Sequence, residues 1–322
     1  MVLLYQLDGK IPNLALLRIA AHHAALGDKV ELRTTGYPKP ELFCDPHLVY
    51  GSAIFTRSKP AVERLRALYP HAVIGGTGVD LTTTLESNGI TTKQCDYSPW
   101  HSYRHSIGFT QRGCRLTCKF CVVPSKEGKV TEENTCAEIW RGDPYPRNLV
   151  LLDNDFFGQP NWRQCVKEIQ DGCFKVCLMQ GINVRFINEE SAEALAAMPC
   201  YDDSFKSKRI YTAWDNRGDE ERVIRGLKTL FRYGVPPSRL MVYMLIGYWP
   251  NETEDDWVYR ENMLRELGCM AYPMPYQRTP ATVGFQRFAV SHYSKSMSWD
   301  EFKAAGYRNP HQGKNRAQLV IL

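Results

Sequence analysis

Short apolar runs alternate with amphipathic stretches through the first hundred residues. Strands are predicted at residues 2–7, 29–34, 48–55 and 72–75. Asn13 is suited to cap a helix that ends near Gly27, and residues 60–68 have the pattern of a second helix. This alternation is typical of an α/β layer with a parallel sheet. We therefore expect a small Rossmann-like domain at residues 1–100.

From residue 101 onward a strand followed by a helix recurs six times. Strands are predicted at residues 107–110, 148–153, 175–180, 209–214, 240–246 and 270–274. The helices between them are predicted at residues 132–140, 162–170, 189–198, 220–233 and 253–267, the last with Thr253 as its cap. Six such units predict a partial (β/α)6 TIM-type barrel over residues 101–297. Ligands of such a barrel bind at the carboxyl ends of its strands.

The end of the chain is less regular. Ser298 and Glu301 have the spacing of a capping box, which predicts a short helix followed by a basic tail within residues 298–322. Residues 272–287 are rich in aromatic and basic side chains, and they fit either the lining of a substrate channel or a wrapped loop.

Composition and charge narrow the class of protein. The chain has 322 residues, of which 43% are hydrophobic, enough for a globular core. The net charge of +5 is mild and does not by itself indicate nucleic acid. Eleven cysteines, no signal peptide and no run of about eighteen apolar residues predict a cytoplasmic protein with neither disulfides nor membrane spans.

Three of these cysteines are clustered. Cys114, Cys118 and Cys121 follow the spacing C-x3-C-x2-C in a stretch bounded by glycines. Thiolates hold iron–sulfur clusters, and a cluster with only three protein thiolates leaves one iron open to a substrate or cosubstrate. The alternatives are a zinc loop, which usually needs four ligands, or three reduced thiols.

With the aromatic residue Phe120 before the third cysteine, this motif resembles that of the radical S-adenosylmethionine (radical SAM) superfamily. The resemblance implies an enzyme with a 4Fe–4S cluster on Cys114, Cys118 and Cys121, whose fourth iron is chelated by S-adenosylmethionine. It implies cleavage of that cosubstrate to methionine and a 5'-deoxyadenosyl radical, with an electron donor such as flavodoxin or ferredoxin. Phe120 then belongs to the cofactor-binding residues. The substrate cannot be read from the sequence.

The predicted strand ends supply further candidates. Asp153, Asn154 and Asp155 follow the second barrel strand, where the superfamily places polar residues against the ammonium group of S-adenosylmethionine. Carboxylates suit this contact because they form charge-assisted hydrogen bonds. In the alternative, Asp155 caps a turn or helix and only Asn154 or Asp153 is a ligand.

The ends of the later strands carry five more candidate residues. Gln180, Asn183 and Arg185 follow the third strand, where related proteins have cavity-facing residues; Arg185 is suited to a carboxylate or phosphate, or to a surface ion pair. Asp215 follows the fourth strand and either accepts the ribose hydroxyls or caps the next helix. Ile246 ends the fifth strand in a segment that resembles the superfamily's adenine-contacting Gly-x-Ile-x-Gly motif without its first glycine.

The first domain resembles the cobalamin-binding-like domain found in one large branch of the superfamily. The resemblance rests on residues 12–16, 53–56 and 74–78. The branch's axial histidine is missing, because the loop at residues 8–12 contains none, and His47 is interpreted as a surface-loop residue. Cobalamin is therefore possible but not favoured, and the domain is interpreted as degenerate.

Two other functions remain open at this point. One is a cobalamin-dependent radical SAM methyltransferase, and the other is a non-catalytic iron–sulfur electron carrier whose cluster has a fourth cysteine ligand. The remaining barrel cysteines are interpreted as buried or inert thiols. They are Cys136, Cys165, Cys173, Cys177, Cys200 and Cys269.

Overall fold

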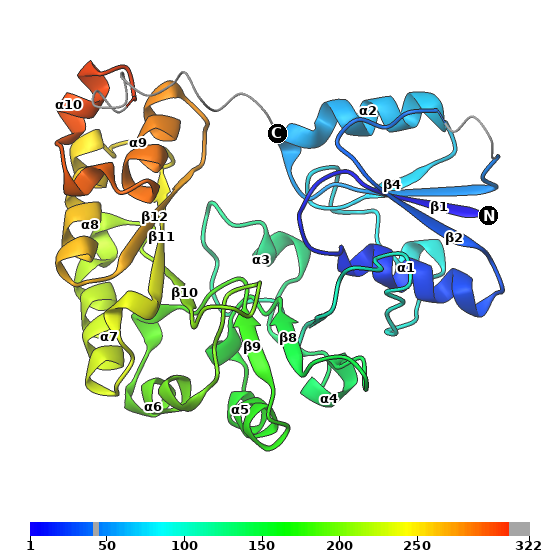
Figure 1. Cartoon of the computed structure of the whole chain (residues 1–322), viewed down its shortest axis with the longest axis horizontal. Coiled ribbons are helices and arrows are strands. Elements are labelled where there is room, and N and C mark those ends of the chain that lie inside the picture. The colour runs from blue at the N-terminus through cyan, green and yellow to red at the C-terminus, as the bar shows by residue number, and fades with distance from the viewer. Residues whose placement is uncertain (41–44, 309–322) are drawn as a thin grey trace, which may run out of the picture. The chain divides into compact units, whose positions relative to one another are not determined.

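A computed structural model describes residues 1–40 and 45–308, and Figure 1 shows the labelled elements. The chain divides into two compact units. The first comprises residues 1–108 with 143–146, and the second comprises residues 109–142 with 147 onward. The fold is mixed α/β with parallel sheets, consistent with a Rossmann-like or TIM-type arrangement. The last part of the predicted basic tail, residues 309–322, lies outside the described residues.

The first unit contains one four-stranded parallel sheet in the order β2-β1-β3-β4. Its strands are β1 (Val2–Gln6), β2 (Val30–Thr34), β3 (Leu48–Ser52) and β4 (Val73–Gly75). Helices α1 (Leu14–Ala25) and α2 (Lys59–Leu68) cover opposite faces of this sheet (Figure 1). Two separate hydrophobic clusters result, since alternate residues of β1 point to opposite faces. The strands and helices predicted here are confirmed.

The strands that were predicted to form a barrel lie close to their predicted positions. The strands at or near the predicted barrel positions are β5 (Ser106–Gly108), which ends the first unit, and then β8 (Asn148–Leu151), β9 (Lys175–Leu178), β10 (Ile210–Ala213), β11 (Leu240–Ile246) and β12 (Met270–Pro275) of the second unit. They form two three-stranded sheets, β5-β8-β9 and β10-β11-β12. An isolated parallel bridge pairs Ile182, which follows β9, with Thr212 of β10. Closure of this set into a partial barrel stays a prediction.

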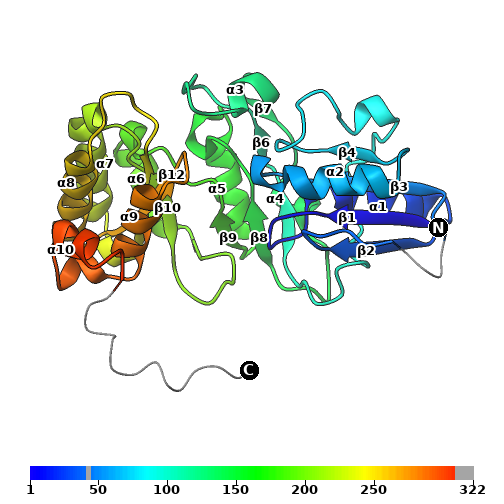
Figure 2. The same ribbon diagram turned by 90° about the horizontal axis from the view of Figure 1, so that it is seen from above.

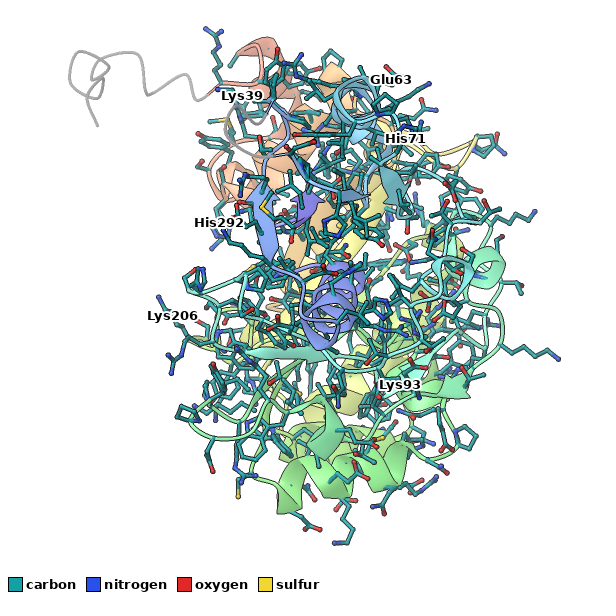
Figure 3. The ribbon with its side chains drawn as sticks, turned by 90° about the vertical axis from the view of Figure 1, so that its right-hand side faces the viewer. Lys39, Glu63, His71, Lys93, Lys206 and His292 are labelled. Carbon is teal, nitrogen blue, oxygen red and sulfur yellow. The ribbon has the colours of Figure 1, made fainter. Side chains whose placement is uncertain are left out.

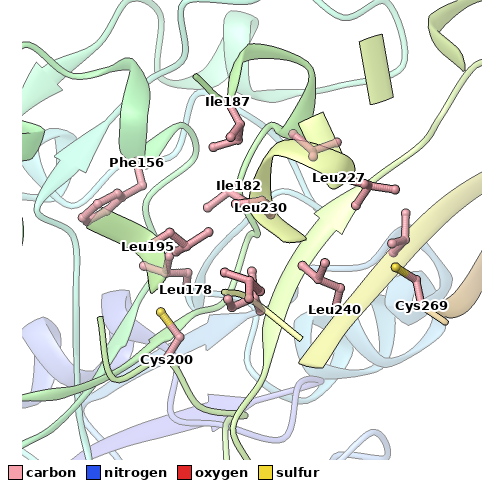
Figure 4. Close-up of a cluster of buried hydrophobic side chains, with 14 of the residues drawn as sticks. Phe156, Leu178, Ile182, Ile187, Leu195, Cys200, Leu227, Leu230, Leu240 and Cys269 are labelled. Atoms are coloured by element: carbon pink, nitrogen blue, oxygen red, sulfur yellow. The ribbon is translucent and has the colours of Figure 1, made fainter. Parts of the chain in front are cut away.

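Eight helices of the second unit are described. They are α3 (Val123–Lys126), α4 (Cys136–Ile139), α5 (Trp162–Asp171), α6 (Glu189–Ala197), α7 (Glu220–Arg232), α8 (Glu254–Glu266), α9 (Pro280–Val290) and α10 (Trp299–Ala304). Figure 2 shows α7 and α8 together on one side of the β10–β12 strands. Their apolar residues and those of α5 and α6 form one large core, part of which is shown in Figure 4. Short 3-10 helices lie at Thr56–Ser58, Glu86–Asn88, Phe156–Gly158, Val184–Phe186, Arg217–Asp219, Pro237–Arg239 and Tyr293–Lys295.

Two predictions of secondary structure are wrong in this unit. The predicted helix at 132–140 shrinks to α4, because Thr135 and Glu138 form a capping box that starts the helix late. Residues 272–287 are not a wrapped loop, because they hold the end of β12 and most of α9, whose Phe285 is fully buried. That they line a substrate channel stays a prediction. Thr279 caps α9. The cap predicted at Thr253 is confirmed and forms a capping box with Asp256. The capping box predicted from Ser298 and Glu301 is confirmed as well.

The exterior carries charges of both signs. Figure 3 labels side chains that point outward, and all six are exposed: Lys39, Glu63, His71, Lys93, Lys206 and His292. Among the described residues, no helix combines the length and apolar character that a membrane crossing needs.

Candidate functional site

The three clustered cysteines lie in a loop that is closed at its base by a small hairpin. Strands β6 (Gln111–Arg112) and β7 (Thr131–Glu132) pair in antiparallel fashion and enclose residues 113–130, here called the cysteine loop. The N–H of Cys114 donates to the carbonyl of Gly128 at 3.2 Å. Gly113 has φ +77° and packs so closely that a Cβ there would lie 2.1 Å from the carbonyl oxygen of Lys129. The hairpin was missed in the sequence because its strands have two residues each.

The three thiols of this loop influence one another. Cys114, Cys118 and Cys121 are free and partly exposed. Burial raises the pKa of Cys114, and the Asp155 carboxylate and the two other sulfurs raise it further. Burial also raises the pKa of Cys121, with Cys118 again contributing. A positive centre would reverse this mutual repulsion, because each thiolate would then be stabilised by the metal.

The donor set fits an iron–sulfur group in its chemistry, since three soft sulfur ligands come from one accessible loop. Within residues 1–40 and 45–308, no three His, Cys, Asp or Glu side chains converge closely enough to hold a metal ion. The sulfurs therefore lie near one another without forming a finished ligand set.

Asp153, after β8, is fully engaged inside the second unit. Its carboxylate accepts from the backbone N–H of Thr110 at 2.7 Å, from the Thr110 hydroxyl, and from the N–H of Gln111 at 3.4 Å. Burial raises the pKa of Asp153 to about 7, although these hydrogen bonds oppose the shift. The residue thus ties the end of β8 to the chain just before the cysteine loop.

Asp155 is buried and pairs with an arginine of the cysteine loop. Its Oδ2 lies 2.8 Å from Nε of Arg115, and its Oδ1 accepts from Nη2 at 3.3 Å. Asp155 precedes a 3-10 helix but its side chain makes no capping hydrogen bond. The alternative in which this side chain caps a turn or helix is therefore wrong.

Asn154 lies between these two carboxylates and is half-buried. Its Nδ2 donates to Oε2 of Glu127 at 2.6 Å. Among the described residues, no hydrogen bond to its Oδ1 is present. Asn154 therefore offers an acceptor beside the cysteine loop.

Gln180, Asn183 and Arg185 follow β9 but have different environments. Gln180 is exposed, and Asn183 caps a 3-10 helix by accepting from the N–H of Arg185 at 3.3 Å. Arg185 pairs with Asp219 at 2.7 Å, as the ion-pair alternative expected. Burial alone would lower its pKa, but Asp219 and the sulfur of Cys118 raise it overall. Arg185 consequently lies beside the second cysteine.

Asp215 and Ile246 end β10 and β11. Asp215 Oδ1 accepts from the N–H of Leu245 at 3.3 Å, and burial raises the pKa of this carboxyl to about 6. Asp215 is not a helix cap, because Asn216 accepts from Gly218 at the following turn. Ile246 is fully buried in the large core, and its carbonyl accepts from the N–H of Tyr276 at 3.0 Å, so its contact with adenine stays a prediction.

An aromatic cluster adjoins the loop at Phe120. The Phe120 ring meets those of Tyr248 and Trp249, with centroids 5.6 and 6.3 Å apart. Tyr248 in turn meets Tyr276 at 4.7 Å. These rings connect Phe120, next to the third cysteine, to the residues that follow β11 and β12; sequence analysis singled out Phe120 and the stretch that contains Tyr276, but missed Tyr248 and Trp249.

The other cysteines of the second unit are buried, as expected of inert thiols, apart from the exposed Cys173. Burial raises the pKa of Cys165 to about 11, and of Cys200 and Cys269 to about 12. It raises the pKa values of Cys136 and Cys177 still further.

The first unit places His47 and the loop after β1 at opposite edges of its sheet. His47 immediately precedes β3, and its N–H donates to the carbonyl of Met1, just before β1. At the carboxyl edge, Asp8 accepts from the N–H groups of Ile54 and Phe55 at 2.8 and 2.9 Å. The loop where the axial histidine is missing is thus fastened to the loop after β3.

Comparison with known proteins gives one distant match. No protein-family model matches the chain. A tRNA-2-methylthio-N(6)-dimethylallyladenosine synthase of Sulfurihydrogenibium sp. (strain YO3AOP1) is 22% identical over 192 residues, covering 53% of this chain and 43% of that protein. The chain therefore spans less than half the length of this relative. The match supports the resemblance to the radical SAM superfamily and an enzyme of that general type, while the cobalamin-binding branch stays a prediction.

Proposed function

We propose that this chain is a radical SAM enzyme that begins radical chemistry on its substrate by reductive cleavage of S-adenosylmethionine. The observation that carries the proposal is the cysteine loop, which brings Cys114, Cys118 and Cys121 into mutual influence beside polar strand ends. The distant relative supports the same general class.

The three cysteines would hold a 4Fe–4S cluster. When bound, such a cluster supplies the electron that cleaves the sulfonium of S-adenosylmethionine. The chain's own part is to place the thiols, to bind and orient the cosubstrate, and to keep water from the reacting centre. The loop is closed at its base, and its partly exposed sulfurs leave access for the cosubstrate.

Three side chains are suited to bind the cosubstrate. Oδ1 of Asn154 is an acceptor for the ammonium group. Asp215, whose second carboxylate oxygen accepts no hydrogen bond within the described residues, is suited to the ribose hydroxyls. Arg185 lies beside Cys118 and is suited to the carboxylate, in competition with Asp219. The exposed Gln180, with Asn183 behind it, would line the approach.

The other two functions have less support. An electron carrier needs a fourth sulfur ligand, but the described cysteines of the second unit outside the cysteine loop are buried or, at Cys173, exposed on another turn. A cobalamin-dependent methyltransferase needs a corrinoid site, and the loop expected to carry its histidine is held by Asp8 instead.

The substrate and the electron donor are proposals at the level of class. The name of the relative refers to a modified adenosine of tRNA, so an adenosine-containing RNA is one substrate to test. The mild net charge of +5 gives this substrate no independent support. The donor would be a low-potential protein such as flavodoxin or ferredoxin.

Anaerobic reconstitution tests the cluster. The wild-type protein should bind about four iron and four sulfide per chain, and the triple variant Cys114→Ala, Cys118→Ala, Cys121→Ala should bind none. Cys173→Ala, which removes an exposed thiol outside the loop, should behave like the wild type. Iron retained by the triple variant would overturn the assignment.

A further inference from the structure

We propose that Asp153 and Asp155 are positioning residues that brace the cysteine loop, and that neither binds the cosubstrate. The inference rests on the proposed function, because the loop that they hold is the one that would carry the cluster. It departs from the sequence-based expectation that all three residues 153–155 are candidate ligands.

The first brace lies before the first cysteine. Asp153 is 3% exposed, and both of its oxygens accept hydrogen bonds from Thr110. Gln159 also donates to the Thr110 hydroxyl, at 3.2 Å. Since β6 begins at the next residue, this buried network fixes the base of the hairpin that closes the cysteine loop.

The second brace lies between the first and second cysteines. The Asp155 side chain is 2% exposed and meets the Arg115 guanidinium through two nitrogens. One hydrogen bond from Nη2 to Oδ1 and a close ion pair between Nε and Oδ2 hold Arg115 against this carboxylate, and Oδ2 accepts no hydrogen bond among the described residues. Gly158 makes room for it, because a Cβ at that position would lie 2.0 Å from Oδ2 of Asp155.

The third brace lies after the last cysteine. Asn154 donates to Glu127, whose Oε2 also accepts from the N–H of Gly113 at 3.4 Å. Glu127 therefore links the two ends of the cysteine loop and connects them to the strand end. The free Oδ1 of Asn154 remains available for a ligand.

Three consecutive residues thus hold the loop at points before, between and after its cysteines. Both carboxylates are buried: Asp153 accepts from Thr110 through both oxygens, and the two oxygens of Asp155 face the Arg115 guanidinium. An ammonium group could therefore reach them only by displacing Thr110 or Arg115. Groups that orient ligand-bearing loops affect metal retention, with typical losses of about 10- to 100-fold in affinity on mutation. Retention is therefore the property that these residues should control.

The experiment compares Asp155→Asn, Arg115→Gln and the double variant after anaerobic reconstitution. It measures the rate of iron loss to an excess of chelator, and the S-adenosylmethionine concentration that half-maximally changes the electron paramagnetic resonance spectrum of the reduced protein. Both single variants should lose iron at least about tenfold faster. The double variant should lose iron no faster than either single variant, because each single change already removes the contact between Asp155 and Arg115. The half-maximal concentration should stay at the wild-type value.

Matched controls come from a surface pair of the same type. Glu190→Gln and Arg163→Gln break an exposed arginine–carboxylate contact and should lose iron at the wild-type rate. Thr110→Val, which removes the hydroxyl at Asp153, should accelerate iron loss. If Asp155→Asn does not fold, Arg115→Gln decides the question, because Arg115 is 36% exposed and its change leaves the interior filled.

If Asp155→Asn and Arg115→Gln lose iron at the wild-type rate, the bracing role of this pair is wrong. If Asp155→Asn needs a higher S-adenosylmethionine concentration for the half-maximal spectral change, Asp155 is a cosubstrate ligand. Failure of the wild-type protein to bind iron at all would instead contradict the proposed function, and this inference with it.

Discussion

Asn154 differs from its two neighbours in keeping an unused acceptor beside the cysteine loop. A hydrogen bond from the ammonium group to this oxygen should contribute on the order of 1.5 to 3 kcal/mol. We expect Asn154→Ala to need roughly tenfold to a hundredfold more S-adenosylmethionine for half-maximal 5'-deoxyadenosine formation, with rescue at high concentration. Asn88→Ala, on an exposed turn of the first unit, is the control. An unchanged concentration dependence would remove Asn154 from the cosubstrate site.

Asp153 should give folding stability a measurable pH dependence. Its pKa of about 7 lies above the ordinary value of 3.8, so between these values the folded chain holds a proton that the unfolded chain releases. Stability should therefore fall as pH rises, by roughly 1.4 kcal/mol per unit within this window. Asp153→Asn should lack this slope when urea unfolding is followed from pH 4 to 8. Parallel profiles for both proteins would contradict the proton assignment.

The residue types and their spacing predicted the kind of chemistry at this site, but they did not predict which partners its side chains contact. The cysteine motif and the polar strand ends could be read directly from the sequence. The pairing of Asp155 with Arg115 could not, because the two residues are forty positions apart and meet only after the loop folds back. The same holds for Asp215, whose contact with Leu245 depends on the alignment of β10 with β11.

At the scale of elements, β10 and β11 are joined by a buried arginine that the sequence analysis missed. Arg260 of α8 is fully buried, donates to the carbonyls of Trp214 and Leu245 at 2.8 and 3.0 Å, and pairs with Glu252. Both carbonyls lie next to Asp215 or Ile246. Arg260 therefore holds two strand ends of the candidate site in register.

Arg260→Met should destabilise the second unit strongly. The change replaces the guanidinium with an apolar side chain of similar length, and so leaves the two carbonyls and the Glu252 carboxylate without this donor. Breaking one partner of a buried pair costs about 3–5 kcal/mol. Urea unfolding should show this loss, whereas Arg222→Met on the exposed side of α7 should change stability by less than about 0.5 kcal/mol. A loss below 1 kcal/mol for Arg260→Met would contradict the bracing role.

Long periodic segments were predicted well, and short or contact-dependent ones were not. The apolar stripe of α7 and the capping box of α8 are local signals, and both helices form as expected. The β6–β7 hairpin has two residues in each strand, too few for a period to show. Helix α9 was missed although Thr279 and Pro280 mark its start, because its aromatic residues were attributed to a channel.

At the scale of the whole molecule, the first unit has a four-stranded parallel sheet, and the loop after β1 contains no histidine. His47 lies at the amino edge of that sheet, away from the carboxyl ends where such sheets bind ligands. We expect no stoichiometric corrinoid in purified protein, and no change in absorption spectrum or activity for His47→Ala. A hydroxocobalamin band that survives gel filtration would overturn this expectation and favour radical methyl transfer.

The most direct test of the proposed function is the fate of S-adenosylmethionine in the presence of reconstituted, dithionite-reduced protein. The wild-type protein should convert it to 5'-deoxyadenosine and methionine in equal amounts, measured by liquid chromatography with mass spectrometry. The triple cysteine variant should form neither product, and Cys173→Ala should match the wild type. Fully loaded wild-type protein that leaves S-adenosylmethionine intact would contradict the proposal and favour an electron-carrying role.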